Sequence, residues 1–145
     1  TGGIIRNNTI FVSSPDLLSS SDGFDCGVCL WSACGARVLH NSIASTGDNF
    51  SSVEWRFAGS VGIEITNNIA SHTLRAREDA DALLVSNLQS ASLDLFVDGP
   101  GGDLHLSPDA SDAIGTGASL DPGLCDDDMD GDLRDDPPDI GADER

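Results

Sequence analysis

A seven-residue acidic segment near the C-terminus has the composition of the start of a calcium-binding loop. It reads Asp126-Asp127-Asp128-Met129-Asp130-Gly131-Asp132, with aspartate at the first, third and fifth positions and glycine at the sixth. Calcium loops supply oxygen ligands at such alternate positions. Pro137 stands where the glutamate of the twelfth position is expected. The segment is interpreted either as a solvated acidic turn or as a Ca2+ site with the ligands Asp126, Asp128, Asp130 and Asp132.

Carbohydrate binding is the second chemistry that the residue types allow. Aromatic side chains bind the apolar faces of sugars, and the chain has two tryptophans, Trp31 and Trp55. Both could instead anchor the core or a loop, which is the usual role of large aromatic residues. The charged residues expected to face outward on strand-like segments are Glu54, Arg56 and Glu64.

Catalysis on polysaccharides would require a more specific arrangement. Hydrolysis needs two carboxyl groups across a sugar bond, and elimination needs a base and a cation that stabilises the developing charge. Lysine is absent, so a base or clamp must be arginine or histidine. The further candidates, each also interpretable as solvated surface, are His72, Arg75, Arg77, Asp79 and Asp81. The sequence contains no nucleophile elbow, phosphate loop or Ser/His/Asp spacing.

The four cysteines indicate an oxidising compartment. Their even number allows three full pairings, whereas a single C-x-x-C without a nearby histidine is weak evidence for zinc. Cys26, Cys29 and Cys34 cluster at the end of a loop rich in Ser and Asp. We expect disulfides to fix this loop and to leave no exposed free thiol, with the partner of Cys125 open.

An internal repeat indicates which elements position these residues. Related segments begin at Ile5, Leu39, Ile65 and Val85, each with asparagine between apolar residues. Aligning Asn8, Asn41, Asn67 and Asn87 gives separations of 33, 26 and 20 residues, so a fixed unit is joined by variable loops. In a parallel β-helix, Ile and Val stack in inward columns. Asparagine tolerates left-handed turns and can form a ladder of amides between coils. Ile43 and Ile69 are expected to point inward.

Alternation of apolar and polar residues predicts strands between the repeats. It occurs in Val53-Glu54-Trp55-Arg56-Phe57, in Val61-Gly62-Ile63-Glu64-Ile65 and in Leu93-Asp94-Leu95. The sequence therefore predicts an all-β fold, a right-handed parallel β-helix. The prediction places a solenoid of about five coils in residues 1–98 and an irregular C-terminal cap of the same domain in residues 99–145.

The tail carries short motifs in a fixed order. They are Leu95-Phe96-Val97-Asp98, Gly101-Gly102-Asp103-Leu104-His105-Leu106-Ser107-Pro108, Ser111-Asp112-Ala113-Ile114-Gly115, Asp128-Met129-Asp130-Gly131-Asp132-Leu133-Arg134 and Pro138-Asp139-Ile140-Gly141-Ala142-Asp143-Glu144. This order resembles the C-terminal end of secreted bacterial proteins of the right-handed parallel β-helix repeat group, many of which carry a further surface anchor. The resemblance implies this fold, a secreted life and carbohydrate as the partner class. It transfers no catalytic residue, and the third motif lacks the proline and the second aspartate of the family's element.

Charge limits the classes of partner. The formal net charge is −18 and the pI about 4.1, which disfavours nucleic acid and anionic membranes, and no apolar run is long enough for membrane insertion. The chain begins at Thr1 without a signal-peptide pattern, as expected of a processed or excised piece. Its N-terminal end lacks a cap, so more chain or self-association is expected there. The predicted function is a non-catalytic, secreted or surface-displayed module that is structural or binds polysaccharide. The alternative is a β-helix polysaccharide lyase or glycoside hydrolase, or an inactive fragment of such an enzyme.

Overall fold

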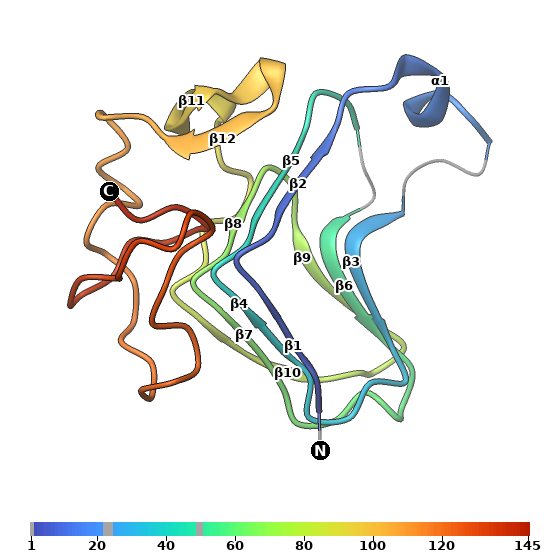
Figure 1. The fold of residues 1–145 in the computed structure, drawn as a ribbon. Coiled ribbons are helices and arrows are strands. Elements are labelled where there is room, and N and C mark those ends of the chain that lie inside the picture. The colour runs from blue at the N-terminus through green and yellow to red at the C-terminus, as the bar shows by residue number, and fades with distance from the viewer. Residues whose placement is uncertain (1, 22–24, 49–50) are drawn as a thin grey trace.

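The strands form a parallel β-solenoid (Figure 1). The computed structural model describes residues 2–21, 25–48 and 51–145. The strands are β1 (Ile4–Arg6), β2 (Thr9–Val12), β3 (Cys26–Trp31), β4 (Arg37–Leu39), β5 (Ser42–Ser45), β6 (Ser51–Arg56), β7 (Ile63–Thr66), β8 (Ile69–Ala70), β9 (Leu74–Arg77), β10 (Ala82–Val85), β11 (Phe96–Asp98) and β12 (Asp103–Leu106). The helical turns are α1 (Pro15–Leu18), η1 (Leu93–Leu95) and η2 (Gly99–Gly101). Within the described ranges, no helix has the length and apolar composition needed to cross a membrane.

Each of the first three coils contributes one strand to each of three parallel sheets, and β10 adds a fourth strand to the first sheet. The sheets have the orders β1-β4-β7-β10, β2-β5-β8 and β3-β6-β9, and Leu88 bridges to Ile69 in the position of a further strand. These elements make about four coils, rather than the predicted five. Leu93-Asp94-Leu95, whose alternation predicted a strand, forms the helical turn η1 instead. The side chain of Ser92 accepts from the Asp94 N–H and starts the turn η1 there, so the chain leaves the solenoid.

Inward-facing residues stack in columns, as predicted. The register aligns Ile5 with Val38 and Val38 with Ile65, and Ile65 with Leu84. On the third sheet, Leu30, Trp55 and Ala76 form another column. Trp55 is therefore buried in the core, which corrects its prediction as a sugar-stacking residue. The cause is strand parity, since Trp55 lies two residues after the inward-facing Val53.

The predicted asparagine ladder forms, but one of its four asparagines differs from the prediction. Nδ2 of Asn8, Asn41 and Asn68 donates to Oδ1 of Asn41, Asn68 and Asn87 respectively, at 2.9 Å each. The rungs are 33, 27 and 19 residues apart, so Asn68 replaces Asn67. This shift of one residue pairs Ile69 with Ser42, so Ile69 faces the tail instead of the core, whereas Ile43 points inward as predicted.

The residue before each rung forms the corner of the coil. Asn7, His40, Asn67 and Ser86 all have left-handed backbone conformations, with φ between 47° and 59°. Asparagine adopts this conformation more readily than most residues. The two roles that the sequence assigned to one asparagine, the left-handed turn and the ladder, are thus divided between neighbouring residues.

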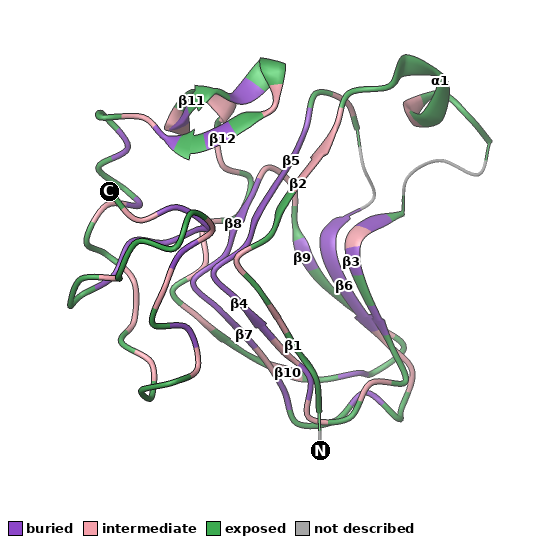
Figure 2. Cartoon of the chain, in the orientation of Figure 1, coloured by how far each residue is buried: buried purple, intermediate pink, exposed green. Residues whose placement is uncertain are grey.

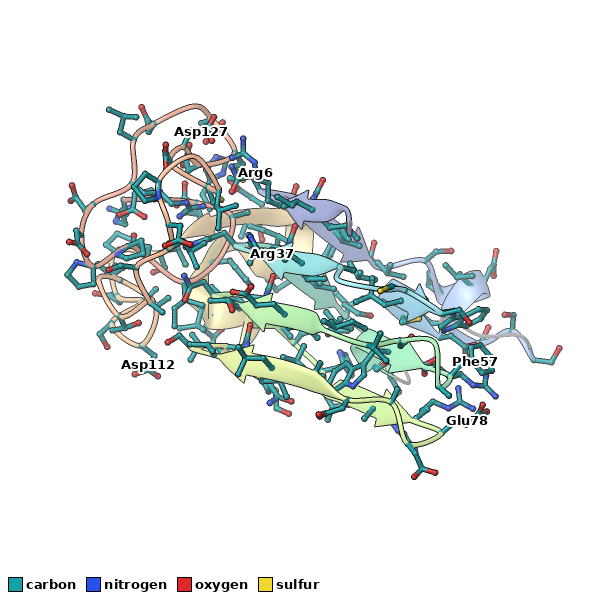
Figure 3. The ribbon with its side chains drawn as sticks, turned by 90° about the horizontal axis from the view of Figure 1, so that it is seen from below. Arg6, Arg37, Phe57, Glu78, Asp112 and Asp127 are labelled. Atoms are coloured by element: carbon teal, nitrogen blue, oxygen red, sulfur yellow. A yellow bond between two sulfur atoms is a disulfide. The ribbon has the colours of Figure 1, made fainter. Side chains whose placement is uncertain are left out.

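The tail returns along the side of the solenoid. Strands β11 and β12 pair antiparallel, and Phe96, Leu104 and Leu106 pack on Ala44 and Ile69 of the second sheet. The chain then runs back to the first coil, as the neighbouring labels of Arg6 and Asp127 in Figure 3 show. Asn7 Nδ2 donates to the carbonyl of Asp127 at 2.7 Å. Residues 99–145 therefore cover a lateral face of the solenoid.

Only two of the four cysteines pair. Cys26 and Cys29 form a disulfide, which joins two residues of β3 at the end of the early loop. Cys34 is an exposed thiol and Cys125 a buried one. This corrects the expectation that no exposed free thiol would remain.

Thiol titration can check this pattern. Native protein is expected to react with a thiol reagent at Cys34, while Cys125 reacts only after unfolding, because it is buried with its Sγ 3.0 Å from Asn7 Oδ1 and access limits reactivity. A Cys34→Ser variant should therefore show no fast-reacting thiol. Two fast thiols in the native wild type would contradict the buried position of Cys125.

Candidate functional site

The outward residues of β3, β6 and β9 bring two aromatic and three basic side chains together on one face of the solenoid. The register aligns Cys29 with Glu54 and Arg75, and Trp31 with Arg56 and Arg77. Phe57 and Glu78 follow directly at the corner. We call the surface made by Trp31, Glu54, Arg56, Phe57, Arg75, Arg77 and Glu78 the β3–β6–β9 outer face.

Trp31 presents an exposed indole with a fixed orientation. Its exposed fraction is 49%, yet its Nε1 donates to Glu54 Oε1 at 3.0 Å. Phe57 packs against it edge to face, with ring centroids 6.2 Å apart and planes at 80°. Two contacts therefore hold the ring while much of its surface stays open to a ligand.

Glu54 anchors this arrangement from below. Its exposed fraction is 0% although it points away from the core, because its neighbours cover it. Oε2 lies 3.2 Å from an Arg77 guanidinium nitrogen, so both carboxylate oxygens have partners. A buried carboxylate requires such compensation, and the ion pair couples the anchor of Trp31 to β9.

Arg56 joins the aromatic cluster to the next coil. Its guanidinium lies 4.7 Å from the centre of the Phe57 ring in a cation–π contact. Its Nε donates to Glu78 Oε1 at 2.8 Å. Phe57 and Glu78 lie close together at one end of the sheet in Figure 3.

Phe57 carries local backbone strain. Its φ is 72°, in the left-handed region that a bulky residue rarely adopts. Ser32 and Glu78 occupy the equivalent corners after β3 and β9, with φ of 54° and 51°. Such strain persists where surrounding contacts over-determine it, and it clusters at functional sites. The sequence did not reveal Phe57, because its role depends on the corner that brings it beside Trp31.

The structure divides the predicted carbohydrate-binding residues. Trp31, Glu54 and Arg56 meet on the β3–β6–β9 outer face, and Arg75 and Arg77 join them. Glu64 lies on β7 of another sheet, where Oε2 is 3.2 Å from Arg37 Nε. Two other enzymatic candidates engage local partners: His72 Nδ1 pairs with Ser71 Oγ at 2.8 Å, and Asp81 accepts from the Ala82 N–H at 2.9 Å. Asp79 has a left-handed backbone conformation at the corner after β9.

Comparison with known proteins finds no family model, curated protein or solved structure that matches the chain. The order of the tail motifs thus stays a resemblance to the secreted β-helix repeat group. The parallel solenoid is established by the strand pairing itself.

Of the four predicted calcium ligands, Asp126 and Asp128 accept hydrogen bonds from separate groups of backbone N–H. Asp126 accepts from the Gly123 N–H at 2.8 Å. Asp128 Oδ1 accepts from the N–H groups of Asp130, Gly131 and Asp132, each at 2.9 Å, and Oδ2 accepts from Glu144. Burial would raise the pKa of Asp128, but these four N–H groups together lower it. Asp128 thus organises the turn through hydrogen bonds from backbone N–H groups, whereas the loop pattern predicted it as a ligand of Ca2+.

A different group of possible ligands converges within the tail. Ligand atoms of His105, Asp130 and Asp143 lie within 4.8 Å of one another, the one such group among the residues described. Asp103 Oδ1 lies 2.5 Å from His105 Nδ1, and Asp130 Oδ2 lies 3.0 Å from Nε2. The hydrogen bond to Asp103 is the largest cause that raises the pKa of His105. Of these residues, only Asp130 belongs to the predicted calcium ligands. The His105 ring is hydrogen-bonded to the Asp103 and Asp130 carboxylates.

Proposed function

We propose that the protein is a secreted or surface-displayed, non-catalytic β-helix module that binds polysaccharide through the β3–β6–β9 outer face. The observation that carries the proposal is the exposed Trp31 indole held in place by the buried Glu54 carboxylate. A ring that is already oriented loses little conformational freedom when a sugar stacks on it. A tryptophan that served only the core would have its face covered, as Trp55 does.

Polysaccharide suits the shape and charge of this surface. Adjacent strands of a sheet lie about 4.8 Å apart, so three strands form a platform long enough for more than one sugar ring. Three of the seven arginines of the chain are on it. Arginine donates several hydrogen bonds in a fixed fork, which fits sugar hydroxyl and carboxylate groups. These arginines locally oppose the net charge of −18.

A binding role has more support than a catalytic one. Hydrolysis requires two carboxyl groups facing the sugar bond, whereas Glu54 is buried against Arg77 and Glu78 is paired with Arg56. These pairs leave the carboxylates of the face committed to orienting its aromatic and basic side chains. The lyase or hydrolase alternative therefore lacks a free acid or base on this surface.

Secretion is supported by two observations of different kinds. The Cys26–Cys29 disulfide suits an oxidising compartment. The tail motifs resemble those of secreted β-helix repeat proteins. Membership of the chain in that group of secreted proteins is therefore part of what we propose.

Glycan binding is the direct test. Wild type is expected to bind a subset of polysaccharides on an array that includes neutral and acidic polymers. Trp31→Ala should lower the affinity tenfold or more, since losing about 1.4 kcal/mol has that effect, while Trp31→Phe keeps part of it. Leu133→Ala, which truncates an exposed apolar side chain of the tail, is the matched control and should bind like wild type.

The same polymers should be assayed for reducing ends and unsaturated products. We expect no turnover by any variant. Undiminished binding by a folded Trp31→Ala variant, or turnover that depends on Glu54, would overturn the proposal.

A further inference from the structure

The asparagine ladder has a direction, and its two ends are complementary. In each rung, the N–H and Nδ2 of one asparagine donate to Oδ1 of the asparagine in the following coil. Asn68, for example, donates both groups to Asn87 Oδ1, each at 2.9 Å. The ladder therefore ends with donors at Asn87 and with an acceptor, Oδ1, at Asn8, and no residue within the described ranges fills that acceptor.

The apolar columns are also open at both ends. Val38 and Ile65, in the middle coils, are fully buried, whereas Leu84 in the same column is 43% exposed. Figure 2 shows the same contrast, with buried β4 and β7 between the more exposed β1 and β10. A solenoid end of this kind exposes strand edges and core side chains that a further coil would cover.

The outward-facing column on the same strands indicates which side chains a further coil should place next to each end. It runs Ile4, Arg37, Glu64, Leu83 in register. Its middle members form an ion pair at 3.2 Å, and its end members are large apolar residues with exposed fractions of 47% for Ile4 and 61% for Leu83. If the last coil of one molecule met the first coil of another, Leu83 would lie beside Ile4.

We propose that two copies of the chain stack head to tail, with β10 of one copy pairing parallel to β1 of the next. This contact places Leu84 against Ile5 and Leu83 against Ile4. It also brings the Asn87 donors onto Asn8 Oδ1, which continues the ladder across the junction. A symmetric contact between like ends would instead set donors against donors. The tail lies beside the coils (Figure 3), where it packs on the second sheet.

Because the two surfaces differ, the contact is heterologous and can repeat. A stack would align several β3–β6–β9 outer faces, although the inference does not depend on the function proposed for them. Each copy carries a charge of −18, so salt that screens the repulsion should strengthen association.

Sedimentation velocity over a concentration series tests the proposal. The wild-type chain is expected to rise above its monomer mass of 15.0 kDa from micromolar to near-millimolar concentration, more so at high salt. Leu83→Arg and Ile4→Glu should each hold the protein at the monomer mass. The double variant should associate again, because its junction joins arginine to glutamate as Arg37 and Glu64 are joined within the solenoid.

Both positions are exposed, and unchanged far-UV spectra and melting would show that the variants fold. A wild type that stays at the monomer mass throughout would overturn the proposal. So would a double variant that stays monomeric while wild type associates, since a symmetric contact between like ends would bring arginine to arginine.

Discussion

Replacing Asn68 by alanine is expected to destabilise the fold by about 3–5 kcal/mol. The Asn68 side chain is fully buried. Its Oδ1 accepts from N and Nδ2 of Asn41 at 3.0 and 2.9 Å, and its Nδ2 donates to two backbone carbonyls and to Asn87. A net hydrogen bond contributes about 1 kcal/mol, and each buried group left without a partner costs about 1–3 kcal/mol more. Denaturant unfolding measures the loss.

Asn8→Ala is the matched control at the open end of the ladder. Asn8 is exposed, and its Nδ2 donates to Asn41 Oδ1 and to the carbonyl of Arg6. Water can replace these partners, so the expected loss is about 1 kcal/mol. Similar losses in the two variants would mean that the ladder contributes no more inside the solenoid than at its edge.

Acid is expected to destabilise the protein through His40. Burial is the main cause that lowers the pKa of His40 to about 3, with the positive charge of Arg134 adding to it. The unfolded chain has an ordinary histidine pKa near 6.5. Between these values the unfolded state binds a proton that the folded state excludes, so stability falls as pH falls from about 6.5 to about 3. At ~1.4 kcal/mol for each pH unit, the full loss is roughly 4–5 kcal/mol.

His40→Asn isolates this contribution. Asparagine already occupies the same corner in neighbouring coils, at Asn7 and Asn67, with the same left-handed backbone. The variant should lose the part of the pH dependence due to His40, while the contributions of Asp128, Asp143 and other carboxyl groups stay common to both proteins. Unfolding free energies measured at several pH values give the comparison. Parallel curves for wild type and variant would contradict a neutral, buried His40.

Periodicity predicted the fold because a solenoid repeats one local rule. Inward columns need an apolar residue at every second strand position, and the ladder needs asparagine directly after one corner of each coil, so both are visible in the sequence. The register of the third coil was wrong by one residue because Asn67 and Asn68 are identical in type. Only pairing with Asn41 decides which is the rung.

The candidate site was predictable in part. Trp31 and Glu54 were identified from residue type, but their contact depends on parallel register between strands 23 residues apart. For Trp55 the structure selects the core role, which the sequence had left open beside sugar stacking and which agrees with the outward prediction for Glu54 and Arg56. The acidic segment shows a different limit. A run of aspartates has the same sequence whether its oxygens bind a cation or accept backbone N–H groups, and Asp128 does the latter.

The return of the tail to the first coil changes how the molecule should come apart. A solenoid whose coils contact only their neighbours can peel from either end. Here Asn7 bonds to Asp127 and Arg134 across separations of 120 and 127 residues, so loosening either terminus releases the other. The contacts between Asn7 and the tail close the chain into a loop, so its coils should melt together in one transition. These contacts should also form late in folding, because joining segments so far apart carries a large entropic cost.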